Sequence, residues 1–174
     1  INRNKDSICL NLRDPECMAI LKKLIGKADV LISNYRPGTT KVMGIDYESL
    51  SPLYPRLICC EISAFREKGR ENEPGYDVVV QAASGLIAST GYPGQPPAKP
   101  GPSLADIASG MTMMQGILLA LIERSKTGAG QAVKVRMQDA AMFMMAQYAP
   151  SLIDDPEYEF KPNGMAHIEA TPSN

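Results

Sequence analysis

The chain has 174 residues, of which 44% are hydrophobic and 21% charged, a composition typical of one folded domain or a domain plus an appendage. Its 18 basic and 19 acidic residues give a net charge of −1, whereas nucleic-acid-binding proteins usually carry a basic surplus, so no nucleic-acid partner is expected. The longest strongly apolar stretch without a charge covers residues 110–122. Because a bilayer-spanning helix needs roughly 20 residues, no membrane partner is expected either.

The predicted elements alternate between strands and helices along the chain. In chain order, we expect a half-buried strand over 7–12, a helix from Pro15 to about Gly26, a strand over 30–32, a short helix over 46–53, a strand covered on both faces over 57–62, helices over 76–88 and 103–125, a strand over 131–137 and a last helix over 140–153. This alternation predicts an α/β protein with a mostly parallel, Rossmann-like sheet covered by helices.

The cysteines and the single histidine bear on metal and redox chemistry. No two of these residues have the spacing of a zinc site, so no metal is expected, and His167 is interpreted as structural or exposed. Cys9, Cys59 and Cys60 lie in apolar, strand-like runs, which predicts buried free thiols in a reduced, cytoplasmic protein. A redox-active Cys59–Cys60 pair is the alternative interpretation.

Two segments are predicted to meet beyond the carboxyl ends of the strands, where open α/β sheets bind their ligands. Asn34-Tyr35-Arg36 follows the second predicted strand, and the charged loop after the third leads to Gly75-Tyr76-Asp77. An asparagine, an aromatic ring and an arginine can hold a phosphate and stack on an adenine or ribose. Neither a GxGxxG sequence nor a P-loop is present.

Asp106 is the candidate for covalent chemistry. It lies in the first turn of the predicted helix 103–125, surrounded by the small residues Ala105, Ala108, Ser109 and Gly110. Two interpretations are open at this point: a helix-start acid that the macrodipole stabilises, or a nucleophilic carboxylate displayed on a rigid element that a ligand can approach closely.

Several motifs occur together, in order and in register, over residues 2–145. They are NRNK followed by SICLNL at 2–12, KADVLISNYRPG at 27–38, GYD and QAASGL at 75–86, DIASG at 106–110 and ERSKTGAGQ at 123–131. These segments resemble NRNK-S-I-x-L-D-L, KADVLIENFRPG, GYDxxxQAxSGL, DxxTG and RxKTGxGQ of the class III CoA-transferases, also called the CaiB/BaiF or formyl-CoA transferase family.

The resemblance implies a function and a set of site residues. Asp106 would be the nucleophile that accepts the acyl group of an acyl-CoA, and the CoA contacts would be Asn4, Lys5, Asn34, Tyr35, Arg36, Gly75, Tyr76 and Asp77. Coenzyme A and acyl-CoA would be substrates, with a carboxylic acid as acceptor, no metal and no permanently bound cofactor. Residues 1–153 would be part of the large CoA-binding and catalytic domain, and 154–174 an extension toward a region outside this chain. The full-length protein would be an interlocked homodimer, and this fragment would be catalytically incomplete by itself.

The sequence departs from the family pattern at two places. Val42 stands where the family usually has an arginine, so one phosphate or adenine contact is expected to be lost or moved to Lys41. Ala64-Phe65-Arg66-Glu67-Lys68 replaces a glycine-rich stretch, which bears on the substrate. Two alternatives stay open: a non-catalytic CoA-binding module, and a 2-methylacyl-CoA racemase. The racemases carry a histidine where this chain has Tyr76, and that difference favours the transferase.

Overall fold

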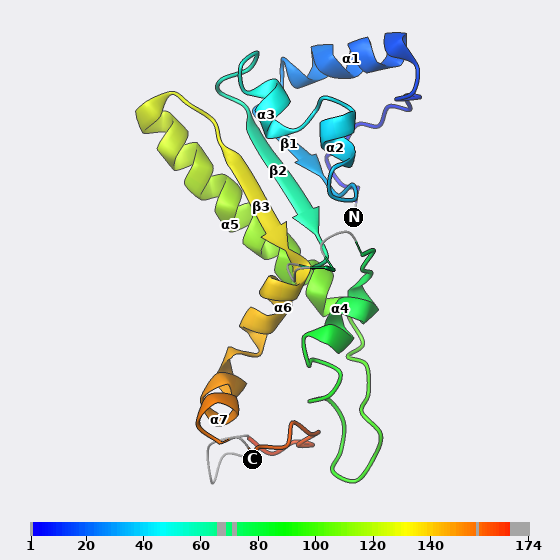
Figure 1. Cartoon of the computed structure of the whole chain (residues 1–174), viewed down its shortest axis with the longest axis vertical. Helices are drawn as coiled ribbons and strands as arrows, with labels where there is room; N and C mark the ends of the chain where they lie inside the picture. The colour runs from blue at the N-terminus through cyan, green and yellow to red at the C-terminus, as the bar shows by residue number, and fades with distance from the viewer. Residues whose placement is uncertain (1, 66–68, 71–72, 156, 168–174) are drawn as a thin grey trace.

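The centre of the molecule is a parallel sheet (Figure 1). The computed structural model describes residues 2–65, 69–70, 73–155 and 157–167, and within them three strands pair in the order β1-β2-β3. The strands are β1 (Val30–Ser33), β2 (Ile58–Ser63) and β3 (Ala132–Arg136). Both pairings are parallel, as the alternation of elements predicts.

Helices account for most of the remaining regular structure in the described residues. They are α1 (Pro15–Ile25), α2 (Thr39–Val42), α3 (Tyr47–Leu50), α4 (Asp77–Ala83), α5 (Leu104–Thr127), α6 (Met137–Met144), the 3-10 helix η1 (Ala146–Tyr148) and α7 (Ala149–Asp154). The start of α1 is set locally. Asp14 precedes the helix and accepts the backbone N–H of Glu16 at 2.8 Å, and Pro15 occupies the first turn, where its missing N–H costs nothing.

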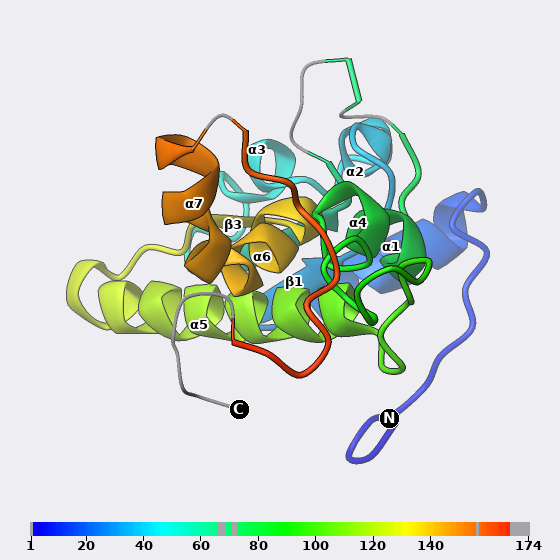
Figure 2. The same ribbon diagram turned by 90° about the horizontal axis from the view of Figure 1, so that it is seen from below.

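The sheet is covered on both faces, with α5 along one face and α3 on the other (Figure 2). Successive side chains of β2 point to opposite faces. Ile58 and Cys60 pack with Met113 of α5, whereas Cys59 packs with a cluster that includes Leu50 of α3. The expectation that this strand is buried from both sides is therefore confirmed at these positions.

A buried arginine fixes the direction of α5. Arg124, near the carboxyl end of the helix, donates to the Asp29 carboxylate at 2.9 Å and to the backbone carbonyl of Arg56 at 2.9 Å. Asp29 and Arg56 precede β1 and β2, so the end of α5 is tied to the amino ends of these strands. The start of α5, with Asp106, therefore lies at the carboxyl ends of the strands.

The strand expected over residues 7–12 does not form. These residues are described, but they form no regular secondary structure, and the sheet begins with β1. The expected alternation appears only in part: Leu10 and Leu12 are half-buried, whereas Ile8, which the pattern places on the same side, is 62% exposed. An extended segment becomes a strand only when a neighbour exchanges backbone hydrogen bonds with it, and alternation carries no information about that neighbour.

Two predicted helices are shorter or more divided than expected. The helix expected to reach residue 88 ends at Ala83, because Gly85 adopts a left-handed conformation (φ +88°) that ends the helical path. The last helix starts at Met137 and is divided into α6, η1 and α7. Pro150 lies in the first turn of α7, where a residue without an N–H group is accommodated.

The cysteine prediction holds in part. Cys59 and Cys60 are buried free thiols, and burial raises their pKa values to about 12 and about 11. At neutral pH both stay protonated, which argues against a redox-active pair. Cys9 is exposed, contrary to expectation, and lies in the segment 7–12, which does not join the sheet.

Helix α5 is also long and apolar enough, by length and composition alone, to cross a membrane. The uncharged stretch of 13 residues used in the sequence argument is shorter than this helix. The helix runs for 24 residues, with a mean hydropathy of 1.5 in its most apolar part. One side of this helix packs on β2 and β3, whereas only 22% of its most apolar part is buried in the described structure.

Candidate active site

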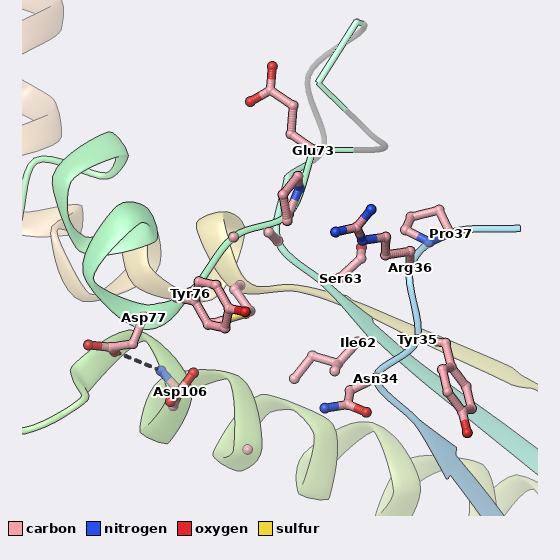
Figure 3. Close-up of a pocket in the computed structure, with 15 residues that line it drawn as sticks. Asn34, Tyr35, Arg36, Pro37, Ile62, Ser63, Glu73, Tyr76, Asp77 and Asp106 are labelled. Carbon is pink, nitrogen blue, oxygen red and sulfur yellow. Dashed lines mark hydrogen bonds between the residues drawn. The ribbon is translucent and has the colours of Figure 1, made fainter. Parts of the chain in front are cut away.

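A pocket of about 560 Å³ opens at the carboxyl ends of the strands (Figure 3). It brings together seven of the nine site residues predicted from the sequence, namely Asn34, Tyr35, Arg36, Gly75, Tyr76, Asp77 and Asp106. These residues come from the segment after β1, the loop before α4 and the first turns of α4 and α5. The convergence occurs because parallel strands all end at the same edge of the sheet.

The segment after β1 forms one wall of the pocket. In Figure 3 the guanidinium group of Arg36 extends over Ser63, and Asn34 lies between Ile62 and α5. Tyr35 also lines the pocket and is 45% exposed, and its ring points away from Asp106. The wall therefore offers a cation, an amide and an accessible ring, the groups that recognise phosphate and nucleotide.

Asp77 joins the two helices that meet at the pocket. Its Oδ1 accepts the backbone N–H groups of Ala105 at 3.0 Å and Asp106 at 3.3 Å, in the first turn of α5. The fully buried Gln81 donates from its amide to the other carboxylate oxygen at 2.5 Å. Ser103, the residue before α5, makes no side-chain cap, so Asp77 from α4 caps this helix instead. Asp77 thus fixes the backbone of the candidate nucleophile.

Asp106 lies at the rim of the pocket with its carboxylate exposed. The pKa of this carboxyl is raised above its ordinary value, first by partial desolvation and second by the negative charge of Asp77. These effects outweigh the favourable N-terminal dipole of α5. A carboxylate with a raised pKa is more basic and is therefore a better nucleophile while it remains ionised.

Gly75 lines the pocket, and packing explains why this residue is a glycine. A Cβ at this position would collide with the Cβ of Ala64 and lie 3.1 Å from the ring of the buried Phe65. The loop before α4 can therefore lie against the end of β2 only with a glycine here. Close packing of the two pocket walls explains this residue without a ligand.

Asn4 and Lys5, the other two predicted CoA contacts, do not line the pocket. They lie in the N-terminal segment, where Asn4 adopts a positive φ of 58° in a turn. Their role stays a prediction. Val42 is 90% exposed and Phe65 is buried, whereas Arg66, Glu67 and Lys68 lie outside the described residues.

Ser63, Glu73 and Met137 are among the further residues that line the pocket and that the sequence argument did not predict as site residues. Ser63 ends β2, and the buried hydroxyl oxygen makes no hydrogen bond within the described part of the chain. The signal that could have identified it is its place directly after the predicted strand 57–62. Glu73 ends the charged loop, and Met137 directly follows β3 at the same edge of the sheet.

Curated relatives of this chain are CoA-transferases. The acetyl-CoA:oxalate CoA-transferase of Acetobacter aceti is 42% identical over 144 residues, which are 82% of this chain and 37% of the relative. The succinyl-CoA:glutarate CoA-transferase of Homo sapiens is 33% identical over 173 residues, which are 99% of this chain and 39% of the relative. The chain thus spans about two fifths of the length of these relatives.

A solved structure has the same fold. A CaiB/BaiF family protein from Brucella suis superposes with a TM-score of 0.90 at 34% identity, covering 98% of this chain and 45% of that protein. This similarity confirms the α/β fold expected from the sequence. The profile of CoA-transferase family III matches residues 1–174. With a family profile over its whole length and relatives that share a third or more of its residues, the chain belongs to CoA-transferase family III.

Proposed function

We propose that the intact protein is an enzyme that moves CoA from an acyl-CoA thioester to a carboxylic acid through covalent intermediates on Asp106. One observation carries the proposal: Asp106 stands at the rim of a pocket whose opposite wall holds Arg36, while Asp77 holds its backbone in place. A fixed nucleophile opposite a cation suits a substrate with a reactive thioester at one end and phosphates at the other.

The chemistry requires two kinds of covalent species on Asp106. The carboxylate attacks the thioester carbonyl, the C–S bond breaks, and CoA leaves as a thiolate, which gives a mixed anhydride. The thiolate then attacks the aspartyl carbonyl and releases the donor acid as a carboxylate. The acceptor carboxylate displaces CoA from the aspartyl thioester, and the thiolate attacks the acceptor carbonyl of the new anhydride. Asp106 is regenerated, and no redox change occurs.

The names of the relatives support small acyl-CoA donors and dicarboxylate acceptors. One is named for acetyl-CoA and oxalate, and the other for succinyl-CoA and glutarate. We propose the same class of substrate for this protein, with CoA as substrate rather than as resident cofactor. Tyr76 supports transfer over racemisation, because the phenol stands where a racemase would need an imidazole base. His167 does not line the pocket.

We also propose a homodimer in the cytoplasm, with no membrane or nucleic-acid partner. The support for a dimer is the number of exposed apolar side chains on two helices, including Met111 and Met114 of α5 and Met142 and Phe143 of α6. Exposed apolar groups in such number are typical of surfaces that another protein segment covers.

The experiment that tests the function uses the intact protein with acetyl-CoA or succinyl-CoA and a panel of carboxylic acids. Formation of a new acyl-CoA is followed by mass spectrometry, and hydroxylamine is added to convert any acyl-aspartyl species at Asp106 to a mass-tagged hydroxamate. Transfer together with a tag at Asp106 supports the proposal. Exchange of the substrate's α-proton with deuterated water would instead support a racemase, and CoA binding without either reaction would support a binding module.

Arg36→Ala is expected to weaken CoA binding by about 1.5–3 kcal/mol, the contribution of a hydrogen bond to a charged group. The reason is the position of this guanidinium group on the pocket wall, where it can meet a phosphate. Calorimetric titration with CoA measures the change. Arg13→Ala removes the same charge from an exposed position outside the pocket and serves as the control. Equal affinities of the two variants would contradict the assignment.

A further inference from the structure

Helix α5 contains two glycines in its interior, Gly110 and Gly116. Glycine inside a helix lowers stability, because its backbone loses more conformational freedom on folding than that of any other residue. Each of these positions therefore calls for an explanation. Gly116 has one in its packing: a Cβ there would lie 2.7 Å from Cγ1 of Val133, a stiff side chain on β3. The helix can approach the sheet this closely only without a side chain at Gly116.

Gly110 has no such explanation. A Cβ at this position would meet no atom within 4 Å in the described structure, and its backbone does not have a positive φ. Alanine would fit the fold and would favour the helix. What distinguishes Gly110 is its location, since it lines the pocket and follows Asp106 by four residues.

Residues four apart lie on the same side of a helix, with their Cβ positions about 5–6 Å apart. A side chain at Gly110 would therefore project into the space next to the Asp106 carboxylate. A reacting carbonyl carbon must come within about 3–3.5 Å of the nucleophile, so the groups attached to that carbon must occupy the same space.

We propose that Gly110 is a specificity-determining residue: the side chain it lacks leaves the room that the acyl group of the thioester occupies beside Asp106. The inference rests on the proposed function and deepens it by assigning the acyl group to one side of the nucleophile. The size of the acyl group that the enzyme accepts is then set by the clearance over one turn of α5.

The test compares Gly110→Ala and Gly110→Leu with the wild type in the intact protein, using acetyl-CoA and succinyl-CoA as donors with one acceptor. Gly110→Ala is expected to raise Tm by about 1–4 °C. It should lower kcat/KM for succinyl-CoA at least tenfold and that for acetyl-CoA less than threefold. Gly110→Leu should lower both at least tenfold, while the affinity for CoA alone stays within about threefold of the wild-type value.

Gly116→Ala is the matched control on the same helix. It is expected to lower Tm, because its Cβ meets Val133, and to leave the ratio of the two donors unchanged. An unchanged donor ratio in Gly110→Ala would overturn the inference, and so would a lower Tm, which would mean that another part of the protein packs on this position. Transfer by the wild type is measured first. A failed inference then appears as an unchanged ratio in a working enzyme, whereas a failed function appears as a wild type without transfer.

Discussion

Asp106→Asn is expected to lower the rate of CoA transfer by at least about 1,000-fold, or about 4 kcal/mol of activation free energy. The amide keeps the size and hydrogen-bonding shape of the carboxyl but removes the charge that attacks the thioester. The variant should also be more stable than the wild type, by up to about 1 kcal/mol, the upper range for a charge interaction at an exposed site. The reason is that burial and Asp77 both disfavour the ionised form of Asp106.

Three measurements on the same protein separate the possible roles of Asp106. Stability is measured by thermal unfolding, CoA affinity by calorimetry and transfer by mass spectrometry, for Asp106→Asn and for Asp106→Ala. A helix-start acid without a chemical role would cost about 0.5–2 kcal/mol of stability and leave transfer nearly intact. CoA affinity should be retained, because the predicted CoA contacts are other residues. A folded Asp106→Ala protein with more than about a tenth of the wild-type rate would refute the mechanism.

The raised pKa of Asp106 also predicts a pH dependence. The nucleophile is the ionised form, so transfer should fall as the pH is lowered, with a midpoint above the ordinary aspartate value of 3.8. Because the folded pKa exceeds the unfolded one, the group contributes most to stability when protonated, and this contribution is lost as pH rises through the two values. The stability advantage of Asp106→Asn should therefore be full at neutral pH and vanish at acidic pH. An advantage that persists unchanged at the acidic end would contradict this account.

Gly130→Ala is expected to destabilise the protein by about 3 kcal/mol or more, the upper range for overpacking in a core. Gly130 lies just before β3, and its N–H donates to the carbonyl of Pro55 at 2.8 Å. A Cβ there would collide with the backbone carbonyl of Leu57 and lie 2.7 Å from the carbonyl carbon of Arg56. Since backbone atoms cannot rotate away as a side chain can, β3 would have to separate from β2.

Thermal or denaturant unfolding measures this loss of stability. The control is Gly101→Ala, because a Cβ at Gly101 meets nothing within 4 Å and its backbone φ is not positive. This control should unfold within about 0.5 kcal/mol of the wild type, as surface substitutions usually do. Equal stabilities of the two variants would show that the β2–β3 contact tolerates a methyl group.

The parts of the fold that follow from local chemistry were predictable from the sequence. The start of α1 depends on Asp14 and on a hydrogen bond that spans two residues, so reading a few neighbouring letters is enough. The strand β2 begins with the apolar run Ile58-Cys59-Cys60, which already implies cover on both faces at these positions. The prediction of a strand over residues 7–12 was wrong because strand formation depends on a partner that is distant in the sequence. The alternation of side chains within a segment carries no information about that partner.

The same distinction applies to the site. The place of Arg36 and Asp106 followed from two general rules, that ligands bind beyond the carboxyl ends of parallel strands and that motif spacing is kept within a family. The role of Asp77 could not be predicted, because the amides it holds lie 28 and 29 residues further along the chain. The sequence suggested a ligand contact for this carboxylate, which stays a prediction; the structure adds that both of its oxygens accept hydrogen bonds from the protein.

The link between α4 and α5 through Asp77 has a consequence for how such proteins can vary. The carboxylate of Asp77 on α4 holds the backbone of Asp106 on α5 directly. The position of Asp106 therefore does not depend only on residues 84–103, which connect the two helices. Insertions and deletions in the exposed part of this connection, residues 92–99, can therefore change its length and shape without moving the nucleophile. Evolution can remodel this exposed stretch while the position of Asp106 is preserved.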